Sequence, residues 1–195
     1  FILFTFMDRK LDKEDSETGV QHDDEFKFSD LLQLVKNKAF WLITILCVLF
    51  YSAVFPFIKY STNFITQKFE IGEDYAGLIP AMLPMASLVL TPFFGSMYDK
   101  KGKGASIMIL GSVLLLFVHL MFAVPSFNNQ FIAVFLIIIL GIALSLVPSA
   151  MWPSVAKIVP EKQLGTAYSV TFWVQNWGLW GVPLLIGWVL EKYCV

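Results

Sequence analysis

The sequence Gly95-Ser-Met-Tyr-Asp-Lys-Lys-Gly-Lys-Gly104 is a short basic stretch between two long apolar segments. The segments cover residues 76–98 and 105–124, and each can cross a bilayer as a helix, which takes roughly 20 residues. So short a loop joins two membrane helices only as an antiparallel pair. Its three lysines outnumber its single acid, and short basic loops remain on the cytoplasmic side of a membrane. The loop therefore sets the orientation of the chain.

The composition places the chain in the membrane class. Hydrophobic residues make up 57% of its 195 residues, charged residues make up 15%, and the mean hydropathy is +0.69. Soluble domains have about 45–50% apolar and about 25% charged residues. The net charge of −1 gives no basic footprint for nucleic acid, so we expect no nucleic-acid partner. The cysteines, Cys47 and Cys194, form neither a disulfide framework nor a metal-ligand spacing.

Five apolar segments are predicted to span the membrane, and prolines inside them predict bends. The segments are residues 39–65, 76–98, 105–124, 131–156 and 166–190. With this topology nearly all of the 14 basic residues lie on the cytoplasmic side, the exceptions being Lys59, Lys68 and Lys192. That distribution follows the positive-inside rule and supports an arrangement that starts inside and ends outside.

The first 38 residues differ from the rest of the chain. Residues 1–7 are apolar and are predicted to be the end of a preceding transmembrane helix. Residues 8–38 are predicted to form a cytoplasmic linker, because most of this stretch is rich in acids and nearly free of large apolar side chains. Within it, residues 26–38 have apolar side chains at helical spacing and predict a short amphipathic helix at the membrane surface. Residues 39–192 are the predicted transmembrane unit.

The basic loop is similar to a known family signature. Gly95-x-x-x-Asp99-Lys100-x-Gly102-Lys103 resembles the motif G-x-x-x-D-[RK]-x-G-[RK]-[RK] of the major facilitator superfamily. In that family the motif joins helices 2 and 3, and a weaker copy joins helices 8 and 9. The departure is Gly104, where a second basic residue is usual, and it suits the weaker copy. The alternative interpretation is an ordinary positive-inside loop.

The residues of this signature loop have simple physical roles. Gly95 lets two helix ends approach closely, and Gly102 permits a positive φ in the turn. Asp99 either caps a helix start or pairs with a cation across the interface between two halves of a transporter. Lys100 and Lys103 are suited to anionic lipid head groups. We therefore expect these five residues to act in gating.

The resemblance extends beyond the loop. The runs Val159-Pro-Glu-x-Gln163-Leu-Gly-Thr-Ala-Tyr168 and Gln175-Asn176-x-Gly178-Leu resemble the subfamily named for major facilitator superfamily domain-containing protein 1, whose animal member is a lysosomal transporter of dipeptides. This resemblance implies an all-α, multi-pass transmembrane helical bundle that forms the C-terminal half of a facilitator fold, helices 7–11. It implies three partners: the lipid bilayer, the missing N-terminal half and a small polar substrate such as a dipeptide. The expected location is the inner (plasma) membrane of a bacterium, or the lysosomal membrane if the chain is animal.

By the same resemblance, the first and fourth segments of this half line the central cavity. Carried over to this sequence, that makes Tyr51, Phe55, Lys59 and Asn63 cavity candidates, and their four-residue spacing predicts one helix face. Lys59 would suit a carboxylate of the substrate. It lies about 30 Å along the helix from Lys38, so the alternative is that it extends to the outer membrane interface.

Four further residues stand out within the segments. Gln175 and Asn176 either bond a neighbouring helix or contact substrate, because unpaired amides are costly inside a membrane. Trp152 lies between two prolines and either shapes a gate or is an interfacial aromatic residue. His119 is a candidate proton relay, and packing against a neighbouring helix is the alternative.

None of the five segments contains Asp or Glu. Proton-coupled transporters usually have an intramembrane carboxylate, so a coupled protein would have it in the missing half or would use His119. We expect a secondary active or facilitative transporter that works by alternating access. A non-transporting membrane sensor or assembly scaffold with the same fold is the alternative. The segments and loops show no catalytic triad, metal cluster or phosphate loop, so we expect no enzymatic activity, cofactor or metal.

Overall fold

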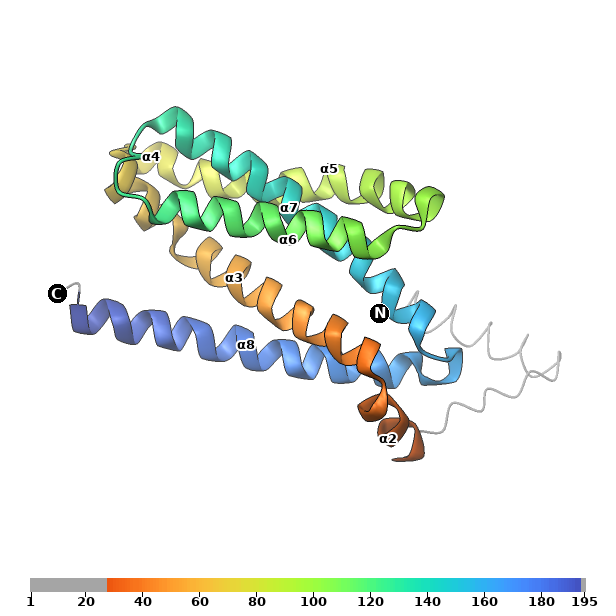
Figure 1. Ribbon diagram of the computed structural model, residues 1–195. Helices are drawn as coiled ribbons and strands as arrows, with labels where there is room; N and C mark the ends of the chain where they lie inside the picture. The colour runs from red at the N-terminus through yellow and green to blue at the C-terminus, as the bar shows by residue number, and fades with distance from the viewer. Residues whose placement is uncertain (1–27, 194–195) are drawn as a thin grey trace, which may run out of the picture.

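The computed structural model describes residues 28–193, and over this range the chain forms helices without strands (Figure 1). The helices are α2 (Phe28–Lys36), α3 (Lys38–Phe69), α4 (Glu73–Ala76), α5 (Leu78–Lys101), α6 (Gly104–Ala123), α7 (Gln130–Ile158), a 3₁₀ turn η1 (Glu161–Gln163) and α8 (Leu164–Tyr193). The predicted helix end at residues 1–7 and most of the predicted linker lie outside the described residues. The fold class is all-α, as the sequence predicts.

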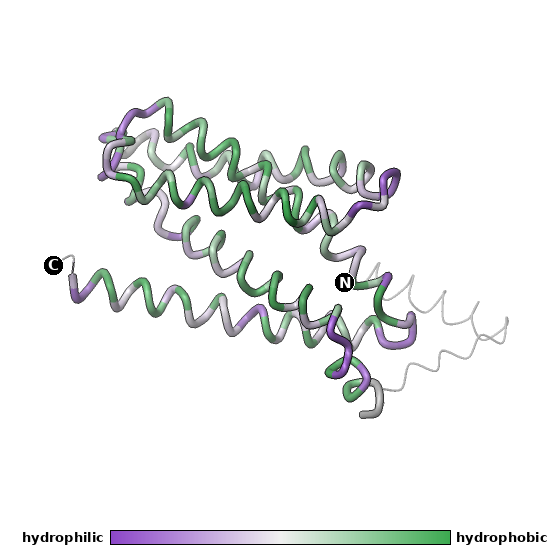
Figure 2. Tube along the Cα trace, viewed as in Figure 1, coloured by the Kyte–Doolittle hydropathy of each residue, from purple (hydrophilic) through white to green (hydrophobic). Residues whose placement is uncertain are grey.

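Four of the described helices, α3, α5, α6 and α7, are long and apolar enough to cross a membrane. They cover the first four apolar segments of the sequence, and Figure 2 shows hydrophobic residues along them and hydrophilic residues at both ends of the bundle. Helix α8 covers the fifth segment and has 30 residues, but it is not among the four. Its two neighbouring amides and its tryptophans lower its mean hydropathy. The fifth span therefore stays a prediction.

Side-chain caps decide where two of the helices begin. The Oδ1 atom of Asn37 accepts hydrogen bonds from the backbone N–H groups two and three residues later, at 3.0 and 3.2 Å. Asn129 caps α7 in the same way, with one bond of 2.9 Å. Because Asn37 starts a new helix, α2 ends at Lys36, two residues before the predicted end of the amphipathic helix.

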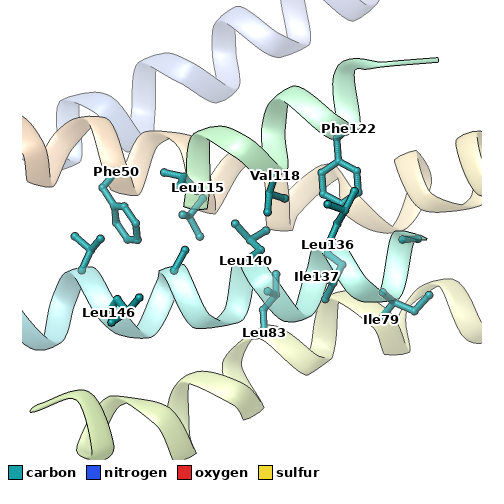
Figure 3. Packing of buried hydrophobic residues seen from close by; sticks show 14 of the residues in the cluster. Phe50, Ile79, Leu83, Leu115, Val118, Phe122, Leu136, Ile137, Leu140 and Leu146 are labelled. Atoms are coloured by element: carbon teal, nitrogen blue, oxygen red, sulfur yellow. The ribbon is translucent and has the colours of Figure 1, made fainter. Parts of the chain in front are cut away.

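The main hydrophobic core lies around α7. Helices α5 and α6 both pack along it, and α7 is more buried than the other three membrane-length helices. Figure 3 shows side chains of α7 packed between those of α5 and α6, and the residues involved are Leu83, Leu115, Val118, Leu136, Ile137 and Leu140. Since lipid tails are as apolar as these side chains, such a core gains its stability from close packing.

Small residues permit that close packing. A Cβ atom at Gly111 would lie 2.6 Å from Cγ2 of Val147, so α6 and α7 meet where Gly111 has no side chain. A Cβ atom at Gly141 would lie 3.0 Å from Cβ of Ala86, which brings α7 against α5. These contacts hold α5, α6 and α7 as one unit.

Helices α3 and α8 form a second pair, joined by polar contacts. The Thr44 and Thr171 hydroxyl oxygens lie 3.4 Å apart, and the Cys47 thiol donates to Oε1 of Gln175 at 3.4 Å. All four side chains are buried. Interhelical hydrogen bonds of this kind hold helices together in a membrane, where the hydrophobic effect does not.

The α3–α8 pair is in close contact at Gly178. A Cβ atom there would lie 2.5 Å from Cγ2 of Val48 and would overlap the Oγ atom of Ser52. Beyond this point α3 leans toward α4 and the α5–α7 unit, while α8 continues straight to its C-terminal end (Figure 1). The two helices therefore diverge over their outer halves.

Helix α2 is attached to the end of the bundle that carries the basic loop (Figure 1). Leu34 is 2% exposed in a cluster with Phe40, Val155, Val159 and Ala167. Two side-chain amides tie the same region together: Gln163 donates to Gln33 at 2.8 Å, and Asn37 donates to the Ile158 carbonyl at 3.2 Å. Helix α2 thus joins the inner ends of α3, α7 and α8.

Candidate functional site

The signature loop connects α5 to α6 at the inner end of the bundle. Gly102 is the C-cap of α5 with φ 63°, and its N–H bonds the Tyr98 carbonyl at 2.8 Å. The predicted positive φ at Gly102 is therefore confirmed. Lys100 lies in the last turn of α5, where a positive charge suits the helix dipole, and both Lys100 and Lys103 are exposed.

Asp99 does not cap a helix start within the described part of the chain. The N-cap of α6 is Lys103, and it has no side-chain cap hydrogen bond. Asp99 lies instead in the last turn of α5 and is exposed. An acid at that end of a helix opposes the dipole. Its other predicted role, pairing with a cation across the interface between two halves, stays a prediction.

The close helix approach predicted for Gly95 falls on Gly104 instead. A Cβ atom at Gly95 would meet no atom within 4 Å, so within the described residues nothing requires glycine there. A Cβ atom at Gly104 would lie 2.6 Å from Cε2 of Tyr98 and 2.9 Å from Oγ of Ser154. Within the described residues the close helix approach is found at Gly104, and the role predicted for Gly95 stays a prediction.

Tyr98 joins the inner ends of three helices. Its ring is 2% exposed beneath Gly104 of α6, and its hydroxyl lies 3.3 Å from Oγ of Ser154 on α7. The Nζ atom of Lys157, also on α7, lies 4.3 Å from the ring centroid, a cation–π contact. The loop is therefore attached to α7 through Tyr98, and such a fixed position suits a residue group that is expected to act in gating.

Three of the predicted cavity residues meet in one aromatic cluster. Tyr51 and Phe55 of α3 stack with their centroids 5.5 Å apart, and Tyr51 and Trp152 of α7 pack against the same hydrophobic core. The Trp152 ring stacks at 4.8 Å on Phe172 of α8, and the Tyr168 hydroxyl donates to the Trp152 carbonyl at 3.2 Å. We name these five residues the aromatic cluster. Phe55 and Phe172 are about half exposed, so its outer face is open.

Lys59 lies in a groove between the diverging halves of α3 and α8. This α3–α8 groove has a volume of about 920 Å³. Its lining residues from α3 are Phe55, Pro56, Ile58, Lys59 and Tyr60, and those from α8 are Leu179, Trp180, Pro183, Leu184, Gly187, Trp188 and Glu191. Phe55 belongs to both the aromatic cluster and the groove, so the two form a continuous surface.

Asn63 and His119 line a different cavity. It has a volume of about 450 Å³ and lies between α3, α6 and α8. Four-residue steps advance about 40° around a helix, so Asn63 is turned about 120° from Tyr51. The interpretation that all four α3 residues share one face therefore holds for the first three and not for Asn63.

The His119 imidazole has one unsatisfied nitrogen. Its Nδ1 atom lies 2.9 Å from the Leu115 carbonyl oxygen, which can only accept, so Nδ1 carries the proton. Its ring also contacts Phe57 edge-on at 5.5 Å. The buried Nε2 atom has no hydrogen-bond partner among the described residues. Both the packing role and the proton relay therefore remain open for this residue.

The neighbouring amides Gln175 and Asn176 have different surroundings. Gln175 is 7% exposed and bonds Cys47 of α3, which is the packing alternative of the prediction. Asn176 is exposed, and its Nδ2 atom donates to the Phe172 carbonyl of its own helix at 2.8 Å. With three tryptophans it lines a hollow of about 420 Å³. Of the two amides, only Asn176 has an exposed side chain, and its contact with a solute stays a prediction.

The residues of this surface that were not predicted as site residues include Tyr168, Phe172 and Glu191. The first two are reached through Trp152, and no spacing rule within α8 links them to a residue of α7. Glu191 lies one residue beyond the predicted end of the fifth segment, so the sequence places it in a loop. In the structure α8 continues through it and brings it to the groove.

The described residues contain no group of three or more His, Cys, Asp or Glu side chains that could hold a metal ion. Charged side chains at the site are few and are placed at its outer end. The surface is therefore suited to noncovalent binding by aromatic faces, an amide and isolated charges.

The chain is similar to known membrane transporters. It is 35% identical over 97% of its length to the Lysosomal dipeptide transporter MFSD1 of Gallus gallus, and 36% identical over 89% of its length to the protein of the same name from Homo sapiens. It covers 42% and 37% of these two relatives, so it spans about two fifths of their length. It is also 26% identical over 80% of its length to the Inner membrane transport protein YdiN of Escherichia coli (strain K12), of which it covers 38%. No solved structure matches the chain.

The family assignment rests on most of the chain. Residues 1–182 match the family model described as Major Facilitator Superfamily, which includes the signature loop and the helices that carry the aromatic cluster. The helices are those of a multi-pass membrane protein and correspond to half of a facilitator fold. The chain belongs to the major facilitator superfamily.

Proposed function

We propose that the intact protein is a transmembrane transporter of small polar solutes, with dipeptides as the leading class, and that it works by alternating access. The observation that carries this proposal is the open surface of α3, α7 and α8, formed by the aromatic cluster and the α3–α8 groove. Tyr51 and Trp152 pack against the hydrophobic core on one side. The outward-facing side chains of this surface, such as Phe55, Phe172 and Trp180, are exposed. Polar groups left open in a membrane mark a solute path. The printed names of the relatives support the choice of dipeptides.

A single half supplies one wall of such a path. We infer that the N-terminal half of the same transporter faces this surface, and that the Gly95–Gly104 loop closes the inner gate against it. Asp99 is the residue of the loop that would pair across the two halves, because it has no capping role here and opposes its own helix dipole. The membrane would be lysosomal in an animal cell and the inner membrane in a bacterium.

The proposal is tested by uptake of labelled dipeptides into proteoliposomes that contain the intact protein. Uptake without an imposed pH gradient would support facilitated diffusion, which agrees with five segments that lack Asp and Glu. Uptake that requires the gradient would support proton coupling, and a His119→Phe variant then decides whether this histidine takes part. Binding without uptake, by protein shown to be folded, would contradict transport and favour a sensor or scaffold.

A further inference from the structure

The α3–α8 groove has the size of a small-molecule site. Its volume of about 920 Å³ lies within the range of roughly 300–1,000 Å³ that ligand pockets occupy. The groove exists because the helices touch at Gly178 and then diverge toward their outer ends (Figure 1). It therefore lies on the outer side of the aromatic cluster, on the path by which a solute would arrive from outside.

Two opposite charges line the groove, one on each helix. Lys59 belongs to α3 and Glu191 to α8, and both are exposed. Neither makes an ion pair with another residue of the described range. The Lys59 Nζ atom has one weak contact, 5.7 Å from the centroid of the Tyr60 ring. The groove thus offers a cation and an anion that are held apart and do not neutralise each other.

Much of the remaining wall of the groove is aromatic. Phe55, Trp180 and Trp188 line the groove and are 47%, 64% and 55% exposed. Trp180 contacts Trp177 edge-on at 6.1 Å and also lines the hollow around Asn176. Aromatic faces of this kind bind apolar side chains and attract ammonium groups. Trp180 therefore connects the groove to the hollow around Asn176, near the middle of α8.

We propose that the α3–α8 groove is an outer docking site for zwitterionic dipeptides, in which Lys59 binds the carboxylate and Glu191 binds the ammonium group. A dipeptide carries one charge of each sign and two side chains, and the groove offers a cation, an anion and an aromatic wall. Both ends are free in the groove, since neither charged residue has a competing ion pair. This inference rests on the proposed function, because it names how the proposed substrate first binds.

The test measures binding of three matched peptides to the intact protein in nanodiscs of phosphatidylglycerol, a lipid without an ammonium group. The peptides are a free dipeptide, its C-terminal amide and its N-acetyl form. Wild-type protein should bind the free dipeptide about fivefold more tightly than either blocked form, the effect of losing one exposed charge contact. Lys59→Gln should remove the preference over the amide and keep the preference over the acetyl form. Glu191→Gln should do the reverse.

Two variants of nearby charges serve as controls. Lys192 lies against Trp188, with its Nζ atom 4.9 Å from the ring centroid, and does not line the groove. Glu70 is the C-cap of α3 and does not line it either. Lys192→Gln and Glu70→Gln should keep both preferences. If the control variants lose the binding preferences as the groove variants do, the general charge of the outer surface explains binding. The proposed docking site is then wrong.

The two proposals fail in different ways. If the wild-type protein transports dipeptides but Lys59→Gln and Glu191→Gln keep both preferences, the docking site is overturned and the transport function stands. If the preferences change as expected but proteoliposomes take up no dipeptide, the docking site stands and transport is overturned. Absence of any dipeptide binding to folded wild-type protein overturns both. Because all four substituted residues are exposed, loss of folding is not expected in any variant.

Discussion

The ring of Tyr98 covers Gly104 so closely that a Cβ atom on Gly104 would lie 2.6 Å from Cε2 of the tyrosine. This contact explains why the signature loop ends in glycine where the family motif has a second basic residue. A longer side chain would displace Tyr98 from Ser154, to which its hydroxyl is bonded. A positive charge also reaches the Tyr98 ring from α7, through its contact with Lys157.

Gly104→Ala should lower stability, because the added methyl group cannot be placed without moving Tyr98 or Ser154. We expect a loss of about 1–3 kcal/mol, the usual range for overpacking. The measurement is thermal unfolding of the intact protein in nanodiscs. Gly95→Ala is the matched control, since a Cβ atom there meets nothing within 4 Å, and it should be neutral or slightly stabilising. Equal stability of the two variants would show that Tyr98 moves freely.

Gly178→Ala should weaken the contact between α3 and α8. Its methyl group would overlap Ser52 and approach Val48, and neither belongs to a flexible side chain that can turn far away. We expect a loss of about 1–3 kcal/mol in thermal unfolding. Gly181 lies three residues later on the same helix with open space around it, so Gly181→Ala should have little effect. An effect of the same size at both positions would mean that helix propensity, and not the contact, is being measured.

Leu34→Ala should release α2 from the inner end of the bundle. The leucine is 2% exposed, and removal of a fully buried leucine side chain costs about 2–5 kcal/mol. The opening is local, so the measurement is hydrogen exchange of the α2 amides. Leu32, which is 60% exposed on the same helix, provides the control in Leu32→Ala. Faster exchange in α2 for both variants would contradict the assignment of Leu34 as the anchor.

Asp99→Asn should leave the stability of this half unchanged or slightly raised, because an acid in the last turn of α5 opposes the helix dipole. Uptake by the intact protein should nevertheless fall if Asp99 pairs across the two halves. The measurement combines thermal unfolding with dipeptide uptake and with cysteine accessibility at the inner gate. Unchanged uptake and accessibility would remove the gating role of Asp99.

The local requirements of the chain could be read from the sequence. The positive φ of Gly102 follows from a glycine at the end of a helix, so its prediction is confirmed. The four most apolar helices follow from length and hydropathy alone. Contacts between helices could not be predicted in this way. The loop motif does not indicate that Tyr98 and Ser154 lie against Gly104.

The arrangement of the candidate site was predicted in part. Tyr51, Phe55 and Lys59 follow one another along an open face, but the same four-residue spacing turns Asn63 into the cavity with His119. The sequence could not separate Gln175 from Asn176, since their directions depend on which side of α8 faces α3. Glu191 was missed because the predicted segment ended one residue too early.

The two neighbouring amides of α8, Gln175 and Asn176, have a consequence for biogenesis. A helix that contains two amides is poorly suited to enter lipid by itself, as the mean hydropathy of α8 already indicates. Its partner α3 is synthesised more than a hundred residues earlier. In the folded protein, Cys47 and Thr44 of α3 contact Gln175 and Thr171 of α8. Insertion of α8 should therefore wait for α3, so that the order in which helices leave the translocon becomes part of how this half is assembled.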